Sequence, residues 1–525
     1  MNKSYENDTI LSIADYVRQG EKHDGSHLLG IEVEHIIFDN AERSIEYCSF
    51  DGKPGVCDIM AELAPLYKSA EYSSDNNAGK FIKKLVRSDI EVTFEPGGQL
   101  EAAMSPVSSV AEEDAIYSKF LSELENACTK FDCHVEYVGV RPDKCALEVQ
   151  AMSTNRYAAM DARFRCIGTC GPIMMRNSAA LQVSVDFSDE QDCAKKLRVA
   201  TCIAPLIYFL FDNSPVFERA KVGAEASSVS EKDVPPRMAR YHIWRNTDSD
   251  RTGAIHSAFG DFSYEKYACQ AADIPIIYTH GNHANLADEE LADKLNYDYF
   301  YGPHTTREIS HNKKLDPEEI EHVLSMGFYD ARVKQFIELR ACDCVPPKYA
   351  FAYIALVQGI FNNEDALNST FEIFKNANEQ DYINAGQALY RRGWNAKVYG
   401  YSPADILTTL LDIAKSSISA DEAKYLEPAY ALIKAKKNVF ELEGTNFSFK
   451  NRPYEPISTT SKNTEIQLNY YKNNYGDAAG RKNAFALQKE SKAIYANEIV
   501  RQGYLSKVFG LADKLIMSDI VATSC

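Results

Sequence analysis

The sequence has little that would place the chain in a membrane, outside the cell or on nucleic acid. No stretch approaches the roughly 18 consecutive apolar residues of a membrane span. Residues 1–15 lack the apolar core of a secretory signal, so we expect none. Acidic residues outnumber basic ones, 75 to 57, for a net charge of -18, whereas nucleic-acid binders concentrate Lys and Arg. We therefore expect neither a membrane nor a nucleic-acid partner.

The 13 cysteines form no metal-binding or disulfide pattern. Their number is odd and no CxxC pair occurs; the nearest spacings are Cys166/Cys170 and Cys342/Cys344. Scattered thiols are typical of reduced cysteines, and we expect a cytoplasmic protein. A GxxxxGK[ST] motif is also missing, so a P-loop would not hold any nucleotide.

Strand-like and helix-like segments alternate over the first three-quarters of the chain, without repeats. The expected strands are 28–38, a strand–turn–strand unit at 91–101, 180–187 and 335–340, and the expected helices include 110–131 and 192–210. Since no regular strand–helix–strand rhythm appears, the pattern predicts an α+β fold.

The chain becomes mostly helical from residue 346, for example at 349–361 and 403–416. We predict one domain over residues 1–444. A polar stretch and a last helical segment, 482–516, predict a linker and helical extension over 445–525. This extension either forms a separate lobe or packs on the same domain.

Several expected strands carry acidic or hydrogen-bonding residues two positions apart, which places them on one face. These sets are Glu32 with Glu34, Gln99 with Glu101, Gln182 with Ser184 and Asp186, and Glu338 with Arg340; Glu95 precedes the Pro-Gly-Gly turn. One alternative is an antiparallel sheet with a solvated face, which gives the same alternation.

The composition of these faces favours a metal site over a solvated face. Solvated faces mix Lys, Thr and Arg, whereas these are mainly Glu. Two carboxylates about 4 Å apart repel by roughly 4 kcal/mol at an effective dielectric constant of about 20. Divalent cations would relieve this repulsion, and oxygen ligands suit Mg²⁺ or Mn²⁺.

The sequence resembles glutamate–cysteine ligase, in particular the plant-type branch and its bacterial relatives. The resemblance rests on segments that occur in the family's order between residues 28 and 343, and more weakly to about 442. They are GIEVE (30–34), FEPGGQLE (94–101), GPIMM (171–175), ALQVSVDF (180–187), NSP (213–215), RYHIWRNTDSDRTG (240–253) and FIELRACD (336–343). EPGGQxE and HIW followed by DxDRTG are specific, whereas GxExE alone is weak.

The resemblance implies a glutamine-synthetase-like fold, in which a curved antiparallel sheet forms a funnel-shaped active site flanked by helices. It also implies roles for individual residues. Metal ligands would be Glu32, Glu34, Glu95, Glu101 and Glu338; ATP ligands Arg340, Gln182 and Ser184; catalytic residues Arg340 and Glu338; and amino-acid ligands Arg240, Trp244, Arg251 and Met175. Without the resemblance, ion pairing would explain the two substrate arginines and core packing would explain Trp244.

The implied reaction joins the γ-carboxylate of glutamate to the amine of cysteine, with ATP as co-substrate and Mg²⁺ as cofactor, through a γ-glutamyl phosphate. It would be the first step of glutathione-type thiol synthesis. Two departures from the family's pattern, Arg176 and the Cys342/Cys344 pair, bear on the acceptor. The alternatives are a γ-glutamyl ligase that uses another amine and a non-catalytic relative that binds nucleotide or metal.

Overall fold

The structure is a computed structural model that describes most of the chain up to Glu443. The described residues are 7–25, 27–50, 52–75, 78–144, 146, 148–152, 154–214, 237–277 and 305–443. The extension predicted at 445–525 lies outside them. None of the helices in these ranges is long and apolar enough to cross a membrane.

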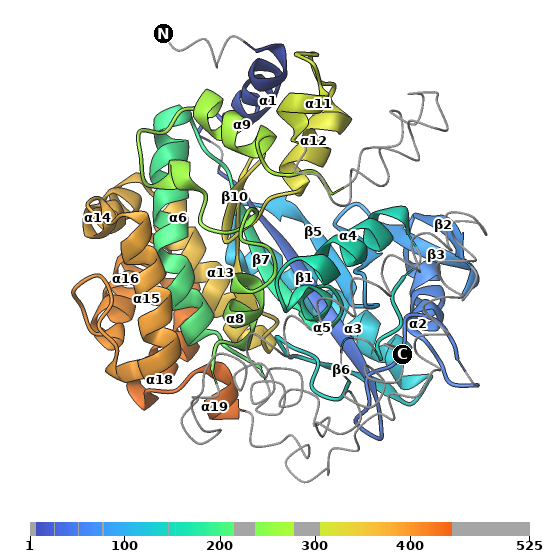
Figure 1. Cartoon of the computed structure of the whole chain (residues 1–525). Coiled ribbons are helices and arrows are strands. Elements are labelled where there is room, and N and C mark those ends of the chain that lie inside the picture. The colour runs from blue at the N-terminus through green and yellow to red at the C-terminus, as the bar shows by residue number, and fades with distance from the viewer. Residues whose placement is uncertain are drawn as a thin grey trace, which may run out of the picture. The chain divides into compact units, whose positions relative to one another are not determined.

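Within the described ranges, nine strands form one antiparallel sheet (Figure 1). They are β1 (Leu29–Asp39), β2 (Ser69–Asp75), β3 (Gly79–Val86), β4 (Ile90–Phe94), β5 (Leu100–Val107), β6 (Cys133–Glu136), β7 (Ala180–Val185), β10 (Ala331–Val333) and β11 (Ile337–Asp343). Their order across the sheet is β10-β11-β7-β1-β5-β4-β3-β2, and β6 pairs with the end of β1. The short strands β8 (Thr252–Gly253) and β9 (Phe328–Tyr329) pair in parallel elsewhere.

One face of the central strands is apolar because β-branched and aliphatic residues alternate with polar ones. Ile31 and Val33 on β1 lie opposite Val183 and Leu181 on β7, and all four side chains are buried. Helices α3 (Val110–Thr129), α6 (Glu190–Leu210) and α13 (Pro347–Phe361) pack against these strands and their neighbours. Burial of this face is the main apolar contribution to holding the sheet and helices together.

The helices within residues 364–417 lie together on one side of the sheet (Figure 1). Besides the strands and α3, α6 and α13, most of the elements are also α-helices. They are α1 (Asp8–Arg18), α2 (Val56–Leu63), α4 (Asn155–Cys166), α5 (Gly171–Asn177), α8 (Ala239–Arg245), α9 (Tyr264–Ala272), α11 (Thr306–Ile309), α12 (Pro317–Ser325), α14 (Glu364–Phe374), α15 (Glu379–Arg392), α16 (Pro403–Ser417), α17 (Ala420–Ala423), α18 (Glu427–Ala435) and α19 (Val439–Glu443). Side-chain caps begin several of them: Ser109 accepts a hydrogen bond at α3 and Asp189 at α6.

The predicted α+β fold is confirmed, and the expected elements lie where the sequence placed them. The strand–turn–strand unit is β4 and β5, and the last two expected strands are β7 and β11. The expected helices correspond to α3, α6, α13 and α16. The relation to glutamine synthetase and the funnel shape stay expectations of the resemblance.

Candidate active site

The polar face of the sheet brings together acidic residues from separate parts of the sequence. Glu34 on β1 lies directly opposite Glu101 on β5, and Glu32 lies opposite Gln182 on β7. Residues directly opposite in an antiparallel pair share a face, so these side chains are neighbours. Glu95 follows the end of β4, beside β5. We call Glu32, Glu34, Glu95 and Glu101 the carboxylate face.

Burial raises the pKa of every carboxyl group on this face, and repulsion from neighbouring carboxylates adds to the effect. The pKa of Glu34 rises to about 7, and that of Glu95 to about 8. The pKa of Glu32 is also raised, with Glu338 as its strongest repulsive neighbour, and that of Glu101 lies well above its usual value. All four side chains keep partial solvent access. These carboxyl groups therefore hold protons more tightly than free ones, and a cation bound between them would favour their ionised form.

Glu34 on β1 is linked through Gln182 on β7 to Arg340 on β11. The backbone N–H of Ala180 donates to Glu34 Oε2 over 3.0 Å, and Gln182 Nε2 donates to Glu34 Oε1 over 3.4 Å. The Gln182 side-chain oxygen accepts from Arg340. Gln182 thus connects an acidic and a basic group, and its role as an ATP ligand stays a prediction.

Ser184 lies between β1 and β11, opposite Gly30 on one side and Glu338 on the other. A Cβ atom at Gly30 would lie 3.5 Å from the Ser184 Cβ, so glycine leaves this part of the face uncovered. Ser184 keeps partial exposure beside the predicted acidic residues. Its role as an ATP ligand stays a prediction.

Glu338 lies among three cations. Arg332 Nε is 2.6 Å from Glu338 Oε2, Lys334 Nζ is 2.7 Å from Oε1, and Arg340 Nη1 is 3.5 Å from Oε2. Burial alone would raise the pKa of Glu338, but these charges hold it below its usual value. We call Arg332, Lys334 and Arg340 the cation cluster. Glu338 is the carboxylate with which all three cations pair. Coordination of a metal by Glu338 would require one of these contacts to break.

Sequence analysis did not single out Arg332 and Lys334. Their signal is an Arg-x-Lys alternation just before the FIELR segment. Arg332 lies opposite Glu338 in the β10–β11 pair, and a tight turn follows, in which the Lys334 N–H donates to the Phe336 carbonyl over 2.8 Å. A hairpin prediction at this point would have placed both cations beside Glu338.

The Pro-Gly-Gly turn between β4 and β5 positions Glu95. Gly98 has a φ of +78°, which favours glycine. At Gly97 a Cβ atom would lie 2.4 Å from the carbonyl oxygen of Arg176, so only glycine allows this approach. This close contact packs the turn next to Glu95 directly against α5.

The side chain of Gln99 is hydrogen-bonded to main-chain groups of this turn and of residues 175–178. Its side-chain oxygen accepts from the Gly97 N–H over 2.9 Å, and its Nε2 donates to the carbonyls of Ser178 over 2.8 Å and Met175 over 3.4 Å. Gln99 is 1% exposed. The β4–β5 pairing continues to this residue, because the Glu95 N–H donates to the Gln99 carbonyl over 2.9 Å. That Gln99 shares a face with Glu101 stays a prediction. Met175 is buried, and its contact with Gln99 is through its main chain.

Arg240 on α8 supports the main chain of β11. Its guanidinium donates to the carbonyls of Arg340, Ala341 and Cys342 over 3.0 to 3.3 Å, beside an irregularity in the β7–β11 pairing. Arg240 Nη1 also lies 3.7 Å from Asp343 Oδ1. These contacts hold the strand that carries Glu338 and Arg340. The substrate role predicted for Arg240 stays a prediction.

Arg251 is fully buried and paired at each donor group. Its Nε lies 2.7 Å from Asp248 Oδ2, and its two terminal nitrogens donate to the carbonyls of Met326 and Pro275 over 3.1 and 2.6 Å. Trp244 is also buried and packs on Phe328, with ring centroids 5.8 Å apart. The structure thus shows packing and ion-pair roles for both residues, and their substrate roles stay predictions.

Arg176, one of the two departures from the family's pattern, also has internal partners. Its Nη2 lies 2.7 Å from Asp161 Oδ1 and its Nη1 donates to the Ala146 carbonyl over 3.2 Å. The side chain is 7% exposed. Since its charge is already paired, Arg176 does not by itself provide a free cation for an acidic acceptor.

The carboxylate oxygens of this face are suitable ligands for Mg²⁺, but their present arrangement is not a complete metal site. As the side chains stand, no three His, Cys, Asp or Glu residues of the described ranges lie close enough together to hold a metal ion. Mg²⁺ often takes only one or two protein carboxylates, with water and substrate phosphates completing its shell. The adjacent Glu34 and Glu101, whose pKa values are raised first by burial and further by neighbouring carboxylates, suit this mode.

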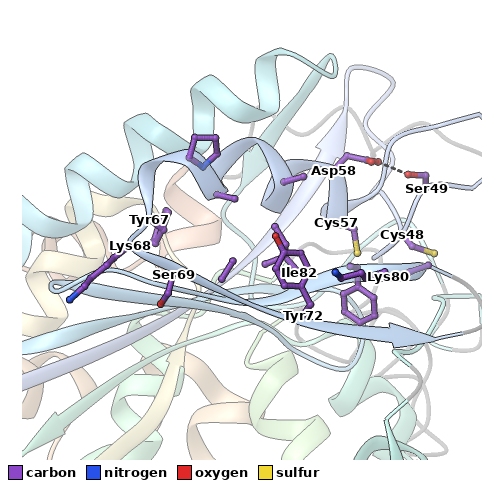
Figure 2. A pocket seen from close by; sticks show the side chains of 16 residues that line it. Cys48, Ser49, Cys57, Asp58, Tyr67, Lys68, Ser69, Tyr72, Lys80 and Ile82 are labelled. Atoms are coloured by element: carbon purple, nitrogen blue, oxygen red, sulfur yellow. Dashed lines mark hydrogen bonds between the residues drawn. The ribbon is translucent and has the colours of Figure 1, made fainter.

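A cavity of about 740 Å³ lies apart from the carboxylate face (Figure 2). Its wall comes from α2, β2, β3 and neighbouring turns, and includes Cys48, Cys57, Tyr72 and Ile82. None of the residues predicted for the site is part of this wall. The carboxylate face and this cavity are therefore separate features.

Known proteins resemble the chain over most of its length. Glutamate–cysteine ligase B of Oryza sativa subsp. japonica, a chloroplast protein, is 25% identical over 381 residues, which span 72% of this chain and 70% of the relative. The chloroplast glutamate–cysteine ligase of Brassica juncea is 27% identical over 368 residues, 68% of this chain and 65% of the relative.

A solved glutamate–cysteine ligase from Francisella tularensis, in complex with AMP, covers 96% of each chain with 12% identity and a TM-score of 0.40. That similarity is too low to support an argument. Residues 28–429 match the sequence profile of glutamate-cysteine ligase family 2, GCS2, and take in every residue of the carboxylate face and the cation cluster. The chain therefore belongs to glutamate-cysteine ligase family 2 and is an enzyme of this ligase family.

Proposed function

We propose that this chain ligates the γ-carboxylate of glutamate to the amine of cysteine, with ATP as co-substrate. The observation that carries the proposal is the carboxylate face on β1, β5 and the end of β4, which β7 alone separates from β11 and the cation cluster. A site of this kind can bind a metal–triphosphate on one side and an anionic substrate group beside it. The names of the similar plant enzymes supply the substrates.

The chemistry needs charge stabilisation more than a protein nucleophile. A carboxylate is a poor acyl donor, because an oxide or hydroxide leaves with difficulty. Transfer of the ATP γ-phosphoryl to the glutamate γ-carboxylate gives an acyl phosphate, which the amine then attacks with release of phosphate. Both steps develop negative charge on oxygen. Arg340 would bind the transferring phosphoryl, because its guanidinium matches phosphate oxygens, and Gln182 would orient Arg340.

Glu34 and Glu101 would hold Mg²⁺, with Glu32 and Glu95 as further donors. The metal would neutralise phosphate charge and screen the repulsion between nucleotide and substrate carboxylate. Its binding would also release protons, since the pKa values of these carboxyl groups are raised. Mn²⁺ offers the same oxygen chemistry. A cytoplasmic location, expected from the scattered thiols, stays a prediction.

Cysteine is the proposed acceptor, and another amine is the alternative. The pairing of Arg176 with Asp161 removes one reason to expect an acidic acceptor. A pocket for a small, weakly polar side chain discriminates modestly, since one methylene group is worth only about 1–3 kcal/mol. We therefore expect 2-aminobutyrate to react as well, with lower kcat/KM.

Phosphate release with glutamate, ATP and a panel of amines tests the proposal. The panel contains cysteine, 2-aminobutyrate, alanine, aspartate and a polyamine, and mass spectrometry identifies each product. Cysteine should give the highest kcat/KM, and release should stop without a divalent cation. If another amine exceeds cysteine tenfold, the acceptor is wrong and the ligase chemistry stands. If no amine gives a γ-glutamyl product, the proposed function is wrong.

A further inference from the structure

The cation cluster has more positive charge than Glu338 requires. Three cations surround this one carboxylate, which is 1% exposed. A single cation would neutralise it. Such an excess of buried or half-buried positive charge is costly unless an anion balances it. Glu32 interacts electrostatically with the same three cations and balances a second positive charge when it is ionised. The positive charge that remains favours an anionic ligand at this end of the polar face.

The three cations differ in how firmly they are held. Arg332 is fixed by Glu338 and by the Gly327 carbonyl, to which its Nη1 donates over 3.1 Å. Arg340 is held by Gln182 as well as Glu338. The Lys334 ammonium has Glu338 as its ion-pair partner, at 2.7 Å, and lies 5.5 Å from the Phe336 ring.

Lys334 is also the most accessible of the three. Its side chain is 24% exposed, against 14% for Arg340 and 8% for Arg332. Its flexible stem extends from the turn between β10 and β11, next to the strand that carries Arg340. A lysine ammonium can turn toward a new anion without loss of a fixed planar geometry. If Lys334 left, Arg332 would still neutralise Glu338.

Resting on the proposed function, we propose that Lys334 is a phosphate ligand for ATP. Its ammonium leaves Glu338 when the nucleotide binds and pairs with a phosphate oxygen beside Arg340. Arg332 is the residue that keeps Glu338 neutralised and in position during this exchange. Of the ATP ligands that the resemblance implies, Arg340, Gln182 and Ser184, only Arg340 is charged, and Lys334 adds a second, mobile cation.

Nucleotide binding, measured without turnover, tests this role. Calorimetry with ADP and with a non-hydrolysable ATP analogue, each with Mg²⁺, compares the wild-type protein with Lys334→Met and Lys334→Gln. Loss of one charged hydrogen bond should weaken binding roughly ten- to hundredfold. Circular dichroism and melting curves establish which variants fold; two substitutions are used so that a folding defect in one leaves the other.

Lys144→Met is the matched control. Lys144 forms a similar half-buried pair, with Nζ 2.7 Å from Glu46 Oε1 and a side chain that is 21% exposed, but it lies outside the carboxylate face and the cation cluster. Its nucleotide affinity should stay within threefold of wild type. Wild-type affinity in either folded Lys334 variant, or equal weakening in Lys144→Met, would overturn the proposal. A wild-type protein that binds no nucleotide would instead overturn the proposed function itself.

Discussion

The charged residues of the carboxylate face and those of the segment from Arg240 to Arg251 have different surroundings in the structure. Both combine charged residues with apolar neighbours, and both belong to segments that carry the resemblance to the family. In the structure, Glu34 and Glu101 lie side by side with raised pKa values. Arg251, in contrast, is fully buried, and its guanidinium pairs with Asp248 and two main-chain carbonyls.

We infer from this difference that the carboxylate face binds a ligand, whereas Arg251 stabilises the fold. Carboxyl groups clustered on a partly accessible face, with pKa values raised by burial and by one another, point to function. A buried charge with a full set of partners costs stability only when a partner is removed. We therefore expect substitutions at the carboxylate face to lower activity and leave stability intact, and substitutions at Arg251 to do the reverse.

The largest effect is expected at the carboxylate face. Glu34→Gln and Glu101→Gln each remove one negative charge with little change in volume, and each should lower kcat/KM by about a hundredfold or more, as loss of one electrostatic catalytic group does elsewhere. Relief of repulsion should raise the melting temperature, and loss of one acceptor oxygen should lower it, because Glu34 accepts from Ala180 and Gln182. We therefore expect little net change in the melting temperature. Glu91→Gln is the control: Glu91 on β4 is 47% exposed and pairs with Lys84. Activity within tenfold of wild type in both variants would contradict the metal assignment.

At Arg251 the comparison predicts a loss of stability. Arg251→Met would leave Asp248 buried without its 2.7 Å partner and two carbonyls without donors. Breaking a buried pair in this way costs about 3–5 kcal/mol. Urea unfolding measures it, with Arg43→Met as the control, since Arg43 is 48% exposed in its pair with Asp39 and such pairs contribute about 0–1 kcal/mol. Unchanged stability with a tenfold higher KM for glutamate would instead identify Arg251 as a substrate ligand.

The sequence predicted the part of the site that depends on strand periodicity. Glu32 and Glu34 share a face because residues two apart on a strand do, and the registers with β5 and β7 then follow from burial of the apolar face. The Pro-Gly-Gly turn could be predicted because the backbone preferences of proline and glycine depend only on the local sequence. These elements need little information from the rest of the chain.

The cation cluster and the roles of the buried arginines depend on tertiary contacts and could not be read in this way. Arg332 pairs with Glu338 only because a tight turn folds β10 onto β11. Arg240 reaches the carbonyls of β11 across about a hundred residues of sequence. Periodicity shows which side chains share a face, but not which charges meet a partner after folding.

A smaller, pH-dependent effect is expected at Glu113 on α3, a buried carboxyl group outside the carboxylate face. It is 0% exposed and neither oxygen has a hydrogen-bond partner in the described part of the chain. Burial raises its pKa from 4.5 to about 8. Between these values the unfolded chain is ionised and the folded protein holds the proton, so stability falls as pH rises from about 5 to 8, by roughly 1.4 kcal/mol per pH unit at most.

Glu113→Gln should therefore flatten the pH dependence of the free energy of unfolding between pH 5 and 8. Urea unfolding at several pH values compares this slope in the wild type, Glu113→Gln and the neighbouring, exposed Glu112→Gln. The slope is the readout, because a buried amide has a cost of its own that does not vary with pH. Equal slopes in the wild type and Glu113→Gln would show that Glu113 is ionised in the folded protein.

The smallest effect on activity is expected at Cys342 and Cys344, which lie close to Glu338 and Arg340 in sequence but point to no thiol chemistry. Both are 0% exposed, and burial raises the pKa of each thiol above its usual value, so neither is a thiolate at neutral pH. Acyl-phosphate chemistry also needs no thiol. Cys342→Ala and Cys344→Ala should each keep kcat within threefold of wild type, with a stability cost of about 1 kcal/mol from the small cavity left. Steady-state kinetics and melting curves on the same preparations separate the two quantities. A tenfold loss of kcat at an unchanged melting temperature would show that a thiol takes part in the reaction, and the carboxylate face with the cation cluster would then be an incomplete account of the site.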